Sequence, residues 1–289
     1  MKKPLFTGVC TALVTPFLSG KVNYPMAKLL LKRQMDAGIK AVVVAGTTGE
    51  SATLTDREKL ELFRQCKEFA KEECNIIAGT GSNSTAHAIE LSIAAQEAGA
   101  DALLVVSPYY NKATPDGLFA HYLSIAHSVS IPVIIYNVPS RTGVDIPVSV
   151  YKRLSKISNI AGVKEASTDI TKILKIRNAC GEDFSIWSGN DDMTVSIMAL
   201  GGQGVISVSS NLCPEEMISM TQAAINGDFE SAGQMQAALQ PLTELLFCEV
   251  NPIPVKAAMA CLGLDCGGCR LPLSALTAEN YKKIKAYFQ

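Results

Sequence analysis

Residues 94–106 read AAQEAGADALLVV, an alanine-rich stretch followed by a glycine and then by a run of aliphatic residues. The same order recurs where Gly38 precedes Ala41 and where Gly202 precedes Val205. A helix that ends on a glycine in the left-handed conformation, followed by a tight turn into a strand, explains this order. Its repetition along the chain predicts a fold of serial strand–helix units.

Eight short aliphatic runs recur along the chain, and longer amphipathic stretches lie between them. The runs are Val9–Val14, Ala41–Val44, Ile76–Ala78, Ala102–Val106, Val133–Tyr136, Ile160–Val163, Ser185–Ser188 and Gly204–Val208. Runs of this length with almost no charge are typical of parallel strands that are buried on both faces. They predict an α/β protein with a (β/α)8 TIM barrel. A doubly wound sheet is the structural rival, but no G-x-G-x-x-G follows the first run.

The strand signal stops after about residue 225. Helix signals also occur within the first 225 residues. Thr55–Glu58 forms a capping box that begins a helix running to about Lys71, and Pro214 is typical of the first position of another helix. The later helical segments are Glu230–Phe247, Pro254–Leu262 and Ala278–Phe288. We therefore expect a barrel that carries the active site over residues 1–225 and a C-terminal helical extension over residues 226–289.

The composition limits the classes of partner. The chain has 289 residues, of which 48% are hydrophobic, and 26 basic residues balance 27 acidic ones. High hydrophobicity with almost no net charge excludes disorder as the main state and gives no basic surface for nucleic acid or an anionic membrane. Pro4 and the pair Thr15–Pro16 interrupt the apolar start, so it does not read as a signal peptide. We expect a cytoplasmic protein that acts on small molecules.

Nine cysteines are scattered along the chain, an odd number that does not indicate a disulfide framework. Reduced thiols, most of them buried, fit a cytoplasmic protein better. Cys261, Cys266 and Cys269 lie close together, but a structural zinc site needs a fourth ligand, and the three histidines are far away in sequence. No metal site is therefore expected.

Lys164 is the residue that points most directly to chemistry. It continues the alternation of Ile160 and Gly162, so the three side chains are expected to share the face that points into the barrel. An amine at the rim of an apolar interior is pushed toward its neutral form and can form a Schiff base with a carbonyl substrate. A solvated lysine at the end of a strand explains the pattern equally well, and the pattern alone leaves both interpretations open.

Other polar residues follow the ends of the predicted strands, where a barrel of this type carries its active site. Tyr136 ends the strand next to that of Lys164, Thr47 and Thr48 lie between two glycines, and Arg141 lies in a turn. Tyr110 follows the fourth run. Each of them alone has an ordinary structural explanation. Together they suggest carbonyl chemistry on acidic substrates.

Three motifs carry a resemblance to a known family. Residues 46–50 (GTTGE), 136–143 (YNVPSRTG) and 162–166 (GVKEA) strongly resemble the dihydrodipicolinate synthase family, within the N-acetylneuraminate lyase superfamily. Residues 108–111 (PYYN), 251–256 (NPIPVK) and 270–273 (RLPL) extend the resemblance over nearly the whole chain. Arg141 in its Ser-Arg-Thr-Gly setting points to the synthases rather than to the sugar-acid lyases.

The resemblance implies a class I aldolase-type condensation that gives 4-hydroxy-tetrahydrodipicolinate, in the diaminopimelate route to lysine. Lys164 would form the imine with pyruvate, and the resulting enamine would attack L-aspartate 4-semialdehyde. Tyr136 would donate and accept protons, linked through Thr47 to Tyr110 in a relay. In the family the tyrosine that matches Tyr110 comes from the neighbouring subunit, so a dimer is the smallest active unit, and we expect a homotetramer built as a dimer of dimers.

The resemblance also implies the binding residues. Thr48 and Ile206 would hold the pyruvate moiety, Arg141 would bind the carboxylate of the semialdehyde, and Gly189 would line the pocket. No metal or organic cofactor is expected, because the protein amine supplies the electron sink.

A lysine effector site is the last feature that the resemblance implies. Its matching residues are Ser51, Ala52, Leu54, Asn83 and Tyr109. The chain departs from lysine-inhibited members at Asp56, Lys59 and His87, where those enzymes typically carry His, His and Glu. Because Lys59 and a protonated His87 repel a cationic effector, we expect weak or absent inhibition by lysine.

Two other functions remain as alternatives at this point. Another Schiff-base lyase, for sialic acid or a keto-deoxy sugar acid, would share Lys164 and Tyr136 but would not need Arg141. A noncatalytic barrel that serves as a scaffold would form no adduct with pyruvate.

Overall fold

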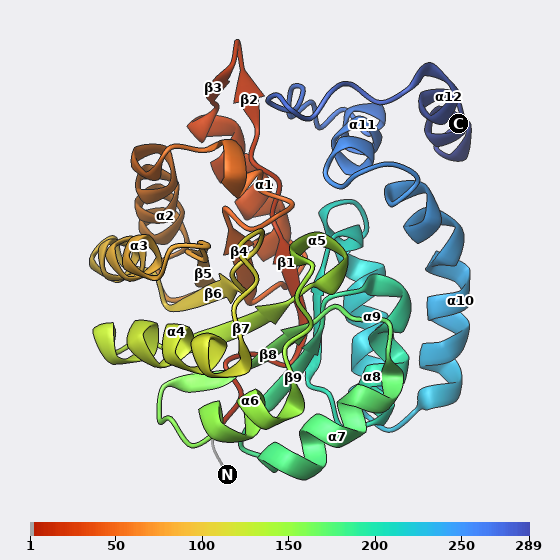
Figure 1. Ribbon diagram of the computed structural model, residues 1–289. Helices are drawn as coiled ribbons and strands as arrows, with labels where there is room; N and C mark the ends of the chain where they lie inside the picture. Colours follow the sequence, from red (N-terminus) through yellow and green to blue (C-terminus); the bar gives the residue numbers. More distant parts are fainter. Residues whose placement is uncertain (1–2) are drawn as a thin grey trace.

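The computed structural model describes residues 3–289 and contains a closed barrel of eight parallel strands (Figure 1). The barrel strands are β1 (Gly8–Ala12), β4 (Ala41–Val44), β5 (Asn75–Gly79), β6 (Ala102–Val106), β7 (Val133–Asn137), β8 (Ile160–Glu165), β9 (Ser185–Ser188) and β10 (Gly204–Ser207). Each strand pairs with the next barrel strand along the chain, and β10 pairs with β1. The predicted (β/α)8 barrel is confirmed, and each predicted strand lies within two residues of the observed one.

Helices surround the barrel and continue beyond it. They are α1 (Tyr24–Asp36), α2 (Asp56–Ala70), α3 (Thr85–Glu97), α4 (Pro115–Ser128), α5 (Pro139–Thr142), α6 (Val148–Leu154), α7 (Ile170–Cys180), α8 (Thr194–Ala199), α9 (Pro214–Ile225), α10 (Phe229–Leu246), α11 (Ile253–Cys261) and α12 (Ala278–Tyr287). Short 3-10 turns occur at Ser51–Thr53, Asp191–Met193 and Ser209–Asn211. The hairpin of β2 (Phe17–Leu18) and β3 (Lys21–Val22) was not predicted, because two-residue strands are too short to show an alternating pattern.

The predicted helix ends are present. Thr55 accepts a hydrogen bond from the backbone of Glu58, whose carboxylate accepts one from the Thr55 backbone at 2.9 Å, so the capping box is complete. Gly38, Gly99 and Gly201 follow α1, α3 and α8 with φ values of 100°, 91° and 89°. These are left-handed conformations that glycine adopts without the steric cost of a Cβ. The repeated helix–glycine–strand junction is therefore confirmed.

The alternating side chains of the strands form two apolar layers. Residues such as Val43, Ile77, Leu104 and Ile206 point into the barrel, whereas their neighbours in sequence pack against the surrounding helices. The inner layer also contains Trp187, whose ring stacks on Phe6 with a centroid distance of 4.8 Å. The interior is a packed core, and polar groups can reach a ligand only near the barrel's ends.

One detail of the predicted alternation in β8 is wrong. The register with β7 shifts between Val133 and Ile134, so that Val133 pairs with Ile160 but Ile134 pairs with Gly162. Ala161 is the extra residue, and Ile160 belongs to the outer layer instead of sharing a face with Lys164. Such an irregularity depends on the neighbouring strand and leaves no trace in the pattern of a single run. Lys164 itself points inward, as predicted, because the shift precedes it.

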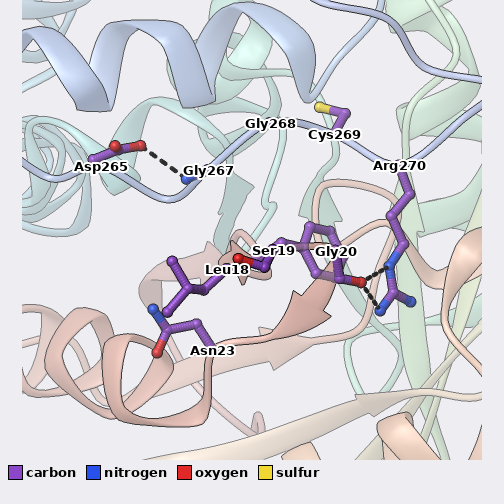
Figure 2. Close-up of a pocket in the computed structure, with 10 residues that line it drawn as sticks. Leu18, Ser19, Gly20, Asn23, Asp265, Gly267, Gly268, Cys269 and Arg270 are labelled. Carbon is purple, nitrogen blue, oxygen red and sulfur yellow. Dashed lines mark hydrogen bonds between the residues drawn. The ribbon is translucent and has the colours of Figure 1, made fainter.

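The C-terminal helices pack on one side of the barrel and then return to the end that carries β2 and β3 (Figure 1). The backbone N–H of Phe17 donates to the carbonyl oxygen of Cys266 at 2.8 Å. Arg270 donates to the carbonyl oxygen of Gly20, across a cavity of about 370 Å³ between the hairpin and residues 265–270 (Figure 2). The predicted C-terminal helices are present, and their last segments are attached to the barrel.

None of the helices within residues 3–289 is both long and apolar enough to cross a membrane. Nor does any group of three or more His, Cys, Asp or Glu residues in this range lie in a position to hold a metal ion. All nine cysteines are free, and Cys10, Cys66, Cys74 and Cys266 are buried, whereas Cys248 is exposed.

His121 makes the stability of the fold depend on pH. Only 3% of His121 is exposed, its Nδ1 lies 2.9 Å from Thr85 Oγ1, and burial lowers the pKa of His121 to about 4 from its ordinary value of 6.5. At pH values between 4 and 6.5 the imidazole binds a proton in the unfolded chain but not in the folded one. The free energy of unfolding therefore decreases as the pH falls from 6.5 toward 4, by about 3 kcal/mol in total. Urea unfolding at a series of pH values measures this loss.

The matched variants are His121→Gln and His127→Gln, because His127 lies on the same helix but is exposed. We expect His121→Gln to flatten the pH dependence and His127→Gln to leave it unchanged. An equally steep dependence in the wild type and in His121→Gln contradicts the prediction.

Candidate active site

Lys164 and Tyr136 face each other inside the barrel. They are direct partners in the register of β7 and β8. The Lys164 Nζ lies 4.4 Å from the centroid of the Tyr136 ring, and only 5% of the lysine is exposed. The alternative of a solvated lysine at a strand end therefore does not describe this residue. An amine and a phenol meet in an apolar enclosure near the end of the barrel.

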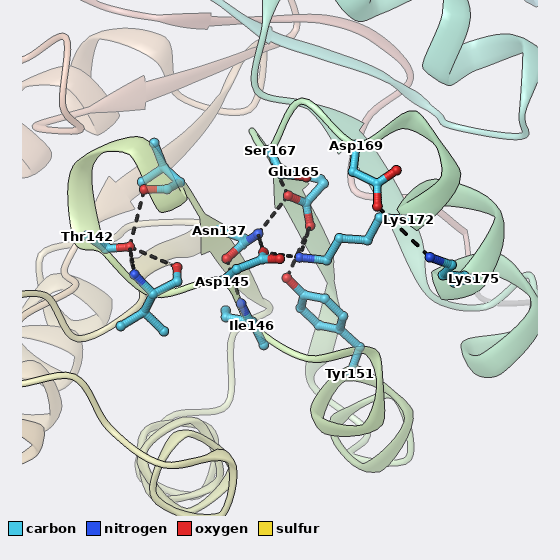
Figure 3. Close-up of polar contacts among 12 residues, drawn as sticks. Asn137, Thr142, Asp145, Ile146, Tyr151, Glu165, Ser167, Asp169, Lys172 and Lys175 are labelled. Atoms are coloured by element: carbon cyan, nitrogen blue, oxygen red, sulfur yellow. Dashed lines mark hydrogen bonds and ion pairs between the residues drawn. The ribbon is translucent and has the colours of Figure 1, made fainter.

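The outer side of β8 fixes this inward orientation of Lys164. The next residue, Glu165, points outward into a buried polar cluster (Figure 3). Its carboxylate accepts hydrogen bonds from Asn137 Nδ2 at 2.7 Å, from the Ser167 backbone at 2.9 Å and from the Tyr151 hydroxyl at 3.2 Å. The Lys172 Nζ lies 3.5 Å away, so the buried carboxylate has a cationic neighbour.

The Tyr151 hydroxyl remains a donor in this cluster. Burial raises the pKa of Tyr151 well above its ordinary value, and the negative charge of Glu165 raises it further. Glu165 and Asn137 lie inside the family motifs, but the sequence pattern predicted no role for them. A charged residue next to Lys164 in a buried strand was the signal that could have revealed them.

Gly189 and Ile206 complete the surroundings of Lys164. A Cβ added at Gly189 would lie 3.2 Å from Lys164 Cε and 2.6 Å from the Cβ of Ala166. No larger residue fits there unless the lysine or its strand moves. Ile206 on β10 is fully buried and belongs to the same inner layer as Tyr136.

A larger cavity of about 620 Å³ opens beside Tyr136. Thr47 and Arg141 line it, the first from the turn after β4 and the second from α5. Thr48 is buried next to Thr47, and its Oγ1 accepts a hydrogen bond from Asn251 Nδ2 at 2.9 Å. The structure thus brings a lysine, a phenol, two threonines and a guanidinium to one end of the barrel.

Glu50 ends the same turn and is buried against the C-terminal segment. Its carboxylate accepts a hydrogen bond from Lys256 Nζ at 2.6 Å and one from the backbone N–H of Arg270 at 2.9 Å. The sequence pattern predicted no role for Glu50 or Lys256. The signal was a lone lysine in the apolar segment Ile253–Cys261, since a buried lysine needs a partner of opposite charge.

Comparison with known proteins agrees with this geometry. Residues 5–289 match the Dihydrodipicolinate synthetase family. The chain is 48% identical over 284 residues to the 4-hydroxy-tetrahydrodipicolinate synthase of Thermoanaerobacter pseudethanolicus. The aligned region covers 98% of this chain and 96% of the relative.

The chain belongs to the dihydrodipicolinate synthetase family.

Two solved structures of the family superpose closely on the barrel. The dihydrodipicolinate synthase from Aquifex aeolicus has a TM-score of 0.96 at 43% identity and covers 98% of this chain and 97% of its own. The enzyme from Cyanidioschyzon merolae, solved with lysine bound, has a TM-score of 0.95 at 41% identity, with the same coverage. The predicted family, fold and enzyme class are confirmed.

Six of the predicted residues do not line the cavity of this family member: Lys164, Thr48, Gly189, Ile206, Tyr110 and Asn83. Tyr110 is 90% exposed, does not line the cavity, and has a φ of 73°, a conformation that is uncommon for a residue with a side chain. Asn83 also lies outside the cavity lining, and its backbone carbonyl accepts a hydrogen bond from Asn111. Within one chain, Tyr110 is therefore not brought together with Thr47 and Tyr136.

The remaining predicted effector residues line the outer part of the same cavity. They are Ser51, Ala52, Leu54 and Tyr109. Asp56 lies beside them, with its Oδ2 2.7 Å from His87 Nε2 and its Oδ1 3.4 Å from Lys59 Nζ. Burial alone would raise the pKa of Asp56, but the hydrogen bond with His87 and the charge of Lys59 lower it overall. Asp56 is thus a carboxylate already paired with two basic side chains.

The ion pair of Lys256 and Glu50 is expected to stabilise the fold. Both side chains are almost fully buried, so Lys256→Met leaves an uncompensated carboxylate and costs about 3–5 kcal/mol in the free energy of unfolding. Urea unfolding at a fixed protein concentration measures the loss. The double variant Lys256→Met with Glu50→Gln removes both charges and should recover much of it. A double variant that is no more stable than Lys256→Met refutes this electrostatic account.

Proposed function

We propose that this chain condenses pyruvate with L-aspartate 4-semialdehyde to give 4-hydroxy-tetrahydrodipicolinate, in the diaminopimelate route to lysine. The proposal rests on one observation above all, the buried Nζ of Lys164 at 4.4 Å from the centre of the Tyr136 ring. The close family relatives that carry the synthase name support it. Arg141 favours the synthase over a sugar-acid lyase, because it lines the same cavity as Tyr136.

The residues divide the covalent chemistry between them. The neutral amine of Lys164 attacks the ketone carbon of pyruvate, and the adduct loses water to form an iminium ion. Loss of a methyl proton then gives an enamine, whose carbon forms the new bond to the aldehyde carbon of the semialdehyde. Tyr136 donates and accepts the protons of these steps. Attack of the semialdehyde's own amine on the iminium carbon closes the ring and releases Lys164, so no metal or organic cofactor is needed.

The binding residues separate the two substrates. Thr48 and Ile206 hold the pyruvate moiety, and Gly189 leaves room for it beside Lys164. Arg141 binds the carboxylate of the semialdehyde, for which the planar fork of a guanidinium is well suited. We place this machinery in a barrel over residues 1–225, with residues 226–289 as a supporting extension.

Tyr110 acts in the active site of a neighbouring subunit in this proposal. Its 90% exposure leaves the phenol available to a second copy of the chain, where it extends the relay from Tyr136 through Thr47 toward solvent. A dimer is then the smallest active unit, and the assembly is a tetramer built as a dimer of dimers. Nine free cysteines fit a reducing compartment, and we assign the protein to the cytoplasm.

Two variants test the separate roles of Lys164 and Arg141. Lys164→Ala should abolish both condensation and the adduct that borohydride traps with pyruvate, because no amine remains to form the imine. Arg141→Ala should keep the pyruvate adduct but raise the KM for the semialdehyde by at least about tenfold, since an ionic hydrogen-bonded pair is lost. Mass spectrometry of the reduced adduct and a coupled assay of condensation provide the two measurements.

Lys175→Ala is the matched control, because Lys175 is an exposed lysine on the neighbouring helix α7. It should retain the adduct and full activity. Equal loss of the pyruvate adduct in Lys164→Ala and Arg141→Ala would show that the two roles are not separate. A wild-type chain without any adduct would exclude a Schiff-base enzyme and leave the noncatalytic scaffold.

Inhibition by lysine is expected to be weak. Lys59 and His87 place basic groups in the outer part of the cavity, and Asp56 is already paired with both. The Cyanidioschyzon merolae relative with lysine bound provides the reference enzyme. Activity measured against increasing lysine should fall much less in this chain than in that relative, and Lys59→His with His87→Glu should increase the sensitivity. Tight inhibition of the wild type would overturn this prediction.

A further inference from the structure

Asn251 lies between the two carboxylate-binding residues of the proposed site. It precedes α11 in the C-terminal segment, and only 5% of it is exposed. Its side-chain Nδ2 donates to Thr48 Oγ1 at 2.9 Å, and its backbone carbonyl accepts a hydrogen bond from Arg141 Nη2 at 3.3 Å. One residue therefore contacts the side chains of both Thr48 and Arg141.

The hydrogen bond to Thr48 determines what the threonine hydroxyl can do. A hydroxyl has one donor and two acceptor positions, and here one acceptor position is used by Asn251. Among residues 3–289, no group accepts a hydrogen bond from the Thr48 hydroxyl itself. Its proton is therefore left for a ligand that carries an acceptor, such as the carboxylate of a keto acid.

The Asn251 side chain is not fully satisfied by the fold. Its Oδ1 is buried, and within the described part of the chain no group donates a hydrogen bond to it. A buried acceptor without a partner lowers stability, and such groups in native proteins are concentrated where function requires them. The turn that carries Thr48 is also attached at Glu50 by Lys256. The position of the amide is therefore not explained by a need to hold the turn.

We propose that Asn251 is a positioning residue that orients the Thr48 hydroxyl as a donor to the keto-acid carboxylate and holds Arg141 for the second substrate. It touches neither reacting carbon. The inference rests on the proposed function, because it assigns the two carboxylates of that reaction to Thr48 and Arg141. It follows that the binding of both substrates depends on one residue of the C-terminal segment.

Asn251→Ala tests the proposal. It leaves the Thr48 hydroxyl free to rotate, so we expect the KM for pyruvate to rise about three- to tenfold, the range for loss of one hydrogen bond, with kcat within about twofold of the wild type. The KM for the semialdehyde should rise by a smaller factor, because Arg141 contacts the backbone of Asn251. The rate at which the borohydride-trapped adduct forms should be lower than in the wild type at low pyruvate concentration and equal to it at saturating pyruvate.

Double variants show whether the effect passes through the named partners. In a Thr48→Val background, Asn251→Ala should add nothing to the KM for pyruvate, and in an Arg141→Ala background it should add nothing to the KM for the semialdehyde. Independent, additive increases in KM would overturn the proposal.

Asn159→Ala is the control for a purely structural loss. The Asn159 side chain donates to the carbonyl oxygens of Ala126 and Val129, and it lies just before β8, at the opposite end of the barrel from Lys164. It should lower stability without changing either KM. If Asn251→Ala behaves like Asn159→Ala while the wild type forms the adduct and the product, this inference fails and the proposed function stands. A wild type without adduct or product overturns both.

Discussion

The buried carboxylate of Glu165, with three hydrogen-bond donors and the Lys172 ammonium close to it, sets the conformation of the end of β8. Because successive side chains of a strand point to opposite faces, an outward Glu165 requires an inward Lys164. Tyr136 stands opposite on β7, and Gly189 on the other side leaves the space that the lysine chain occupies. The orientation of Lys164 therefore depends on a polar cluster on the outer side of β8.

A second constraint comes from the C-terminal segment. Lys256 neutralises Glu50 at one end of the turn after β4, and Asn251 binds Thr48 in its middle. A buried charge is thereby neutralised, and a buried hydroxyl gains one hydrogen bond, across more than 200 residues of sequence. The C-terminal extension therefore helps to hold the turn after β4 in place, because two of its residues bind Glu50 and Thr48.

Much of the fold could be predicted because its signals are local. The apolar runs, the capping box at Thr55 and the glycines after α1, α3 and α8 each depend on a few neighbouring residues. The errors arose where a distant element decides the outcome. The place of Ile160 depends on the pairing of β8 with β7, and the hairpin at Phe17–Val22 is attached to residues near Cys266. Tyr110 is exposed and outside the cavity lining of its own chain, and its place in the site of a neighbouring subunit stays a prediction.

By itself, the sequence determined the barrel and the family, because strand burial, helix ends and the motifs around Lys164 depend on contiguous residues. Only the tertiary structure decided which polar groups satisfy one another. The partners of Glu50, Thr48 and Asp56 lie on other elements, at distances along the chain that no local pattern encodes. Hydrogen bonds and ion pairs between buried groups depend on a few ångströms of geometry, and that geometry exists only once the chain has folded.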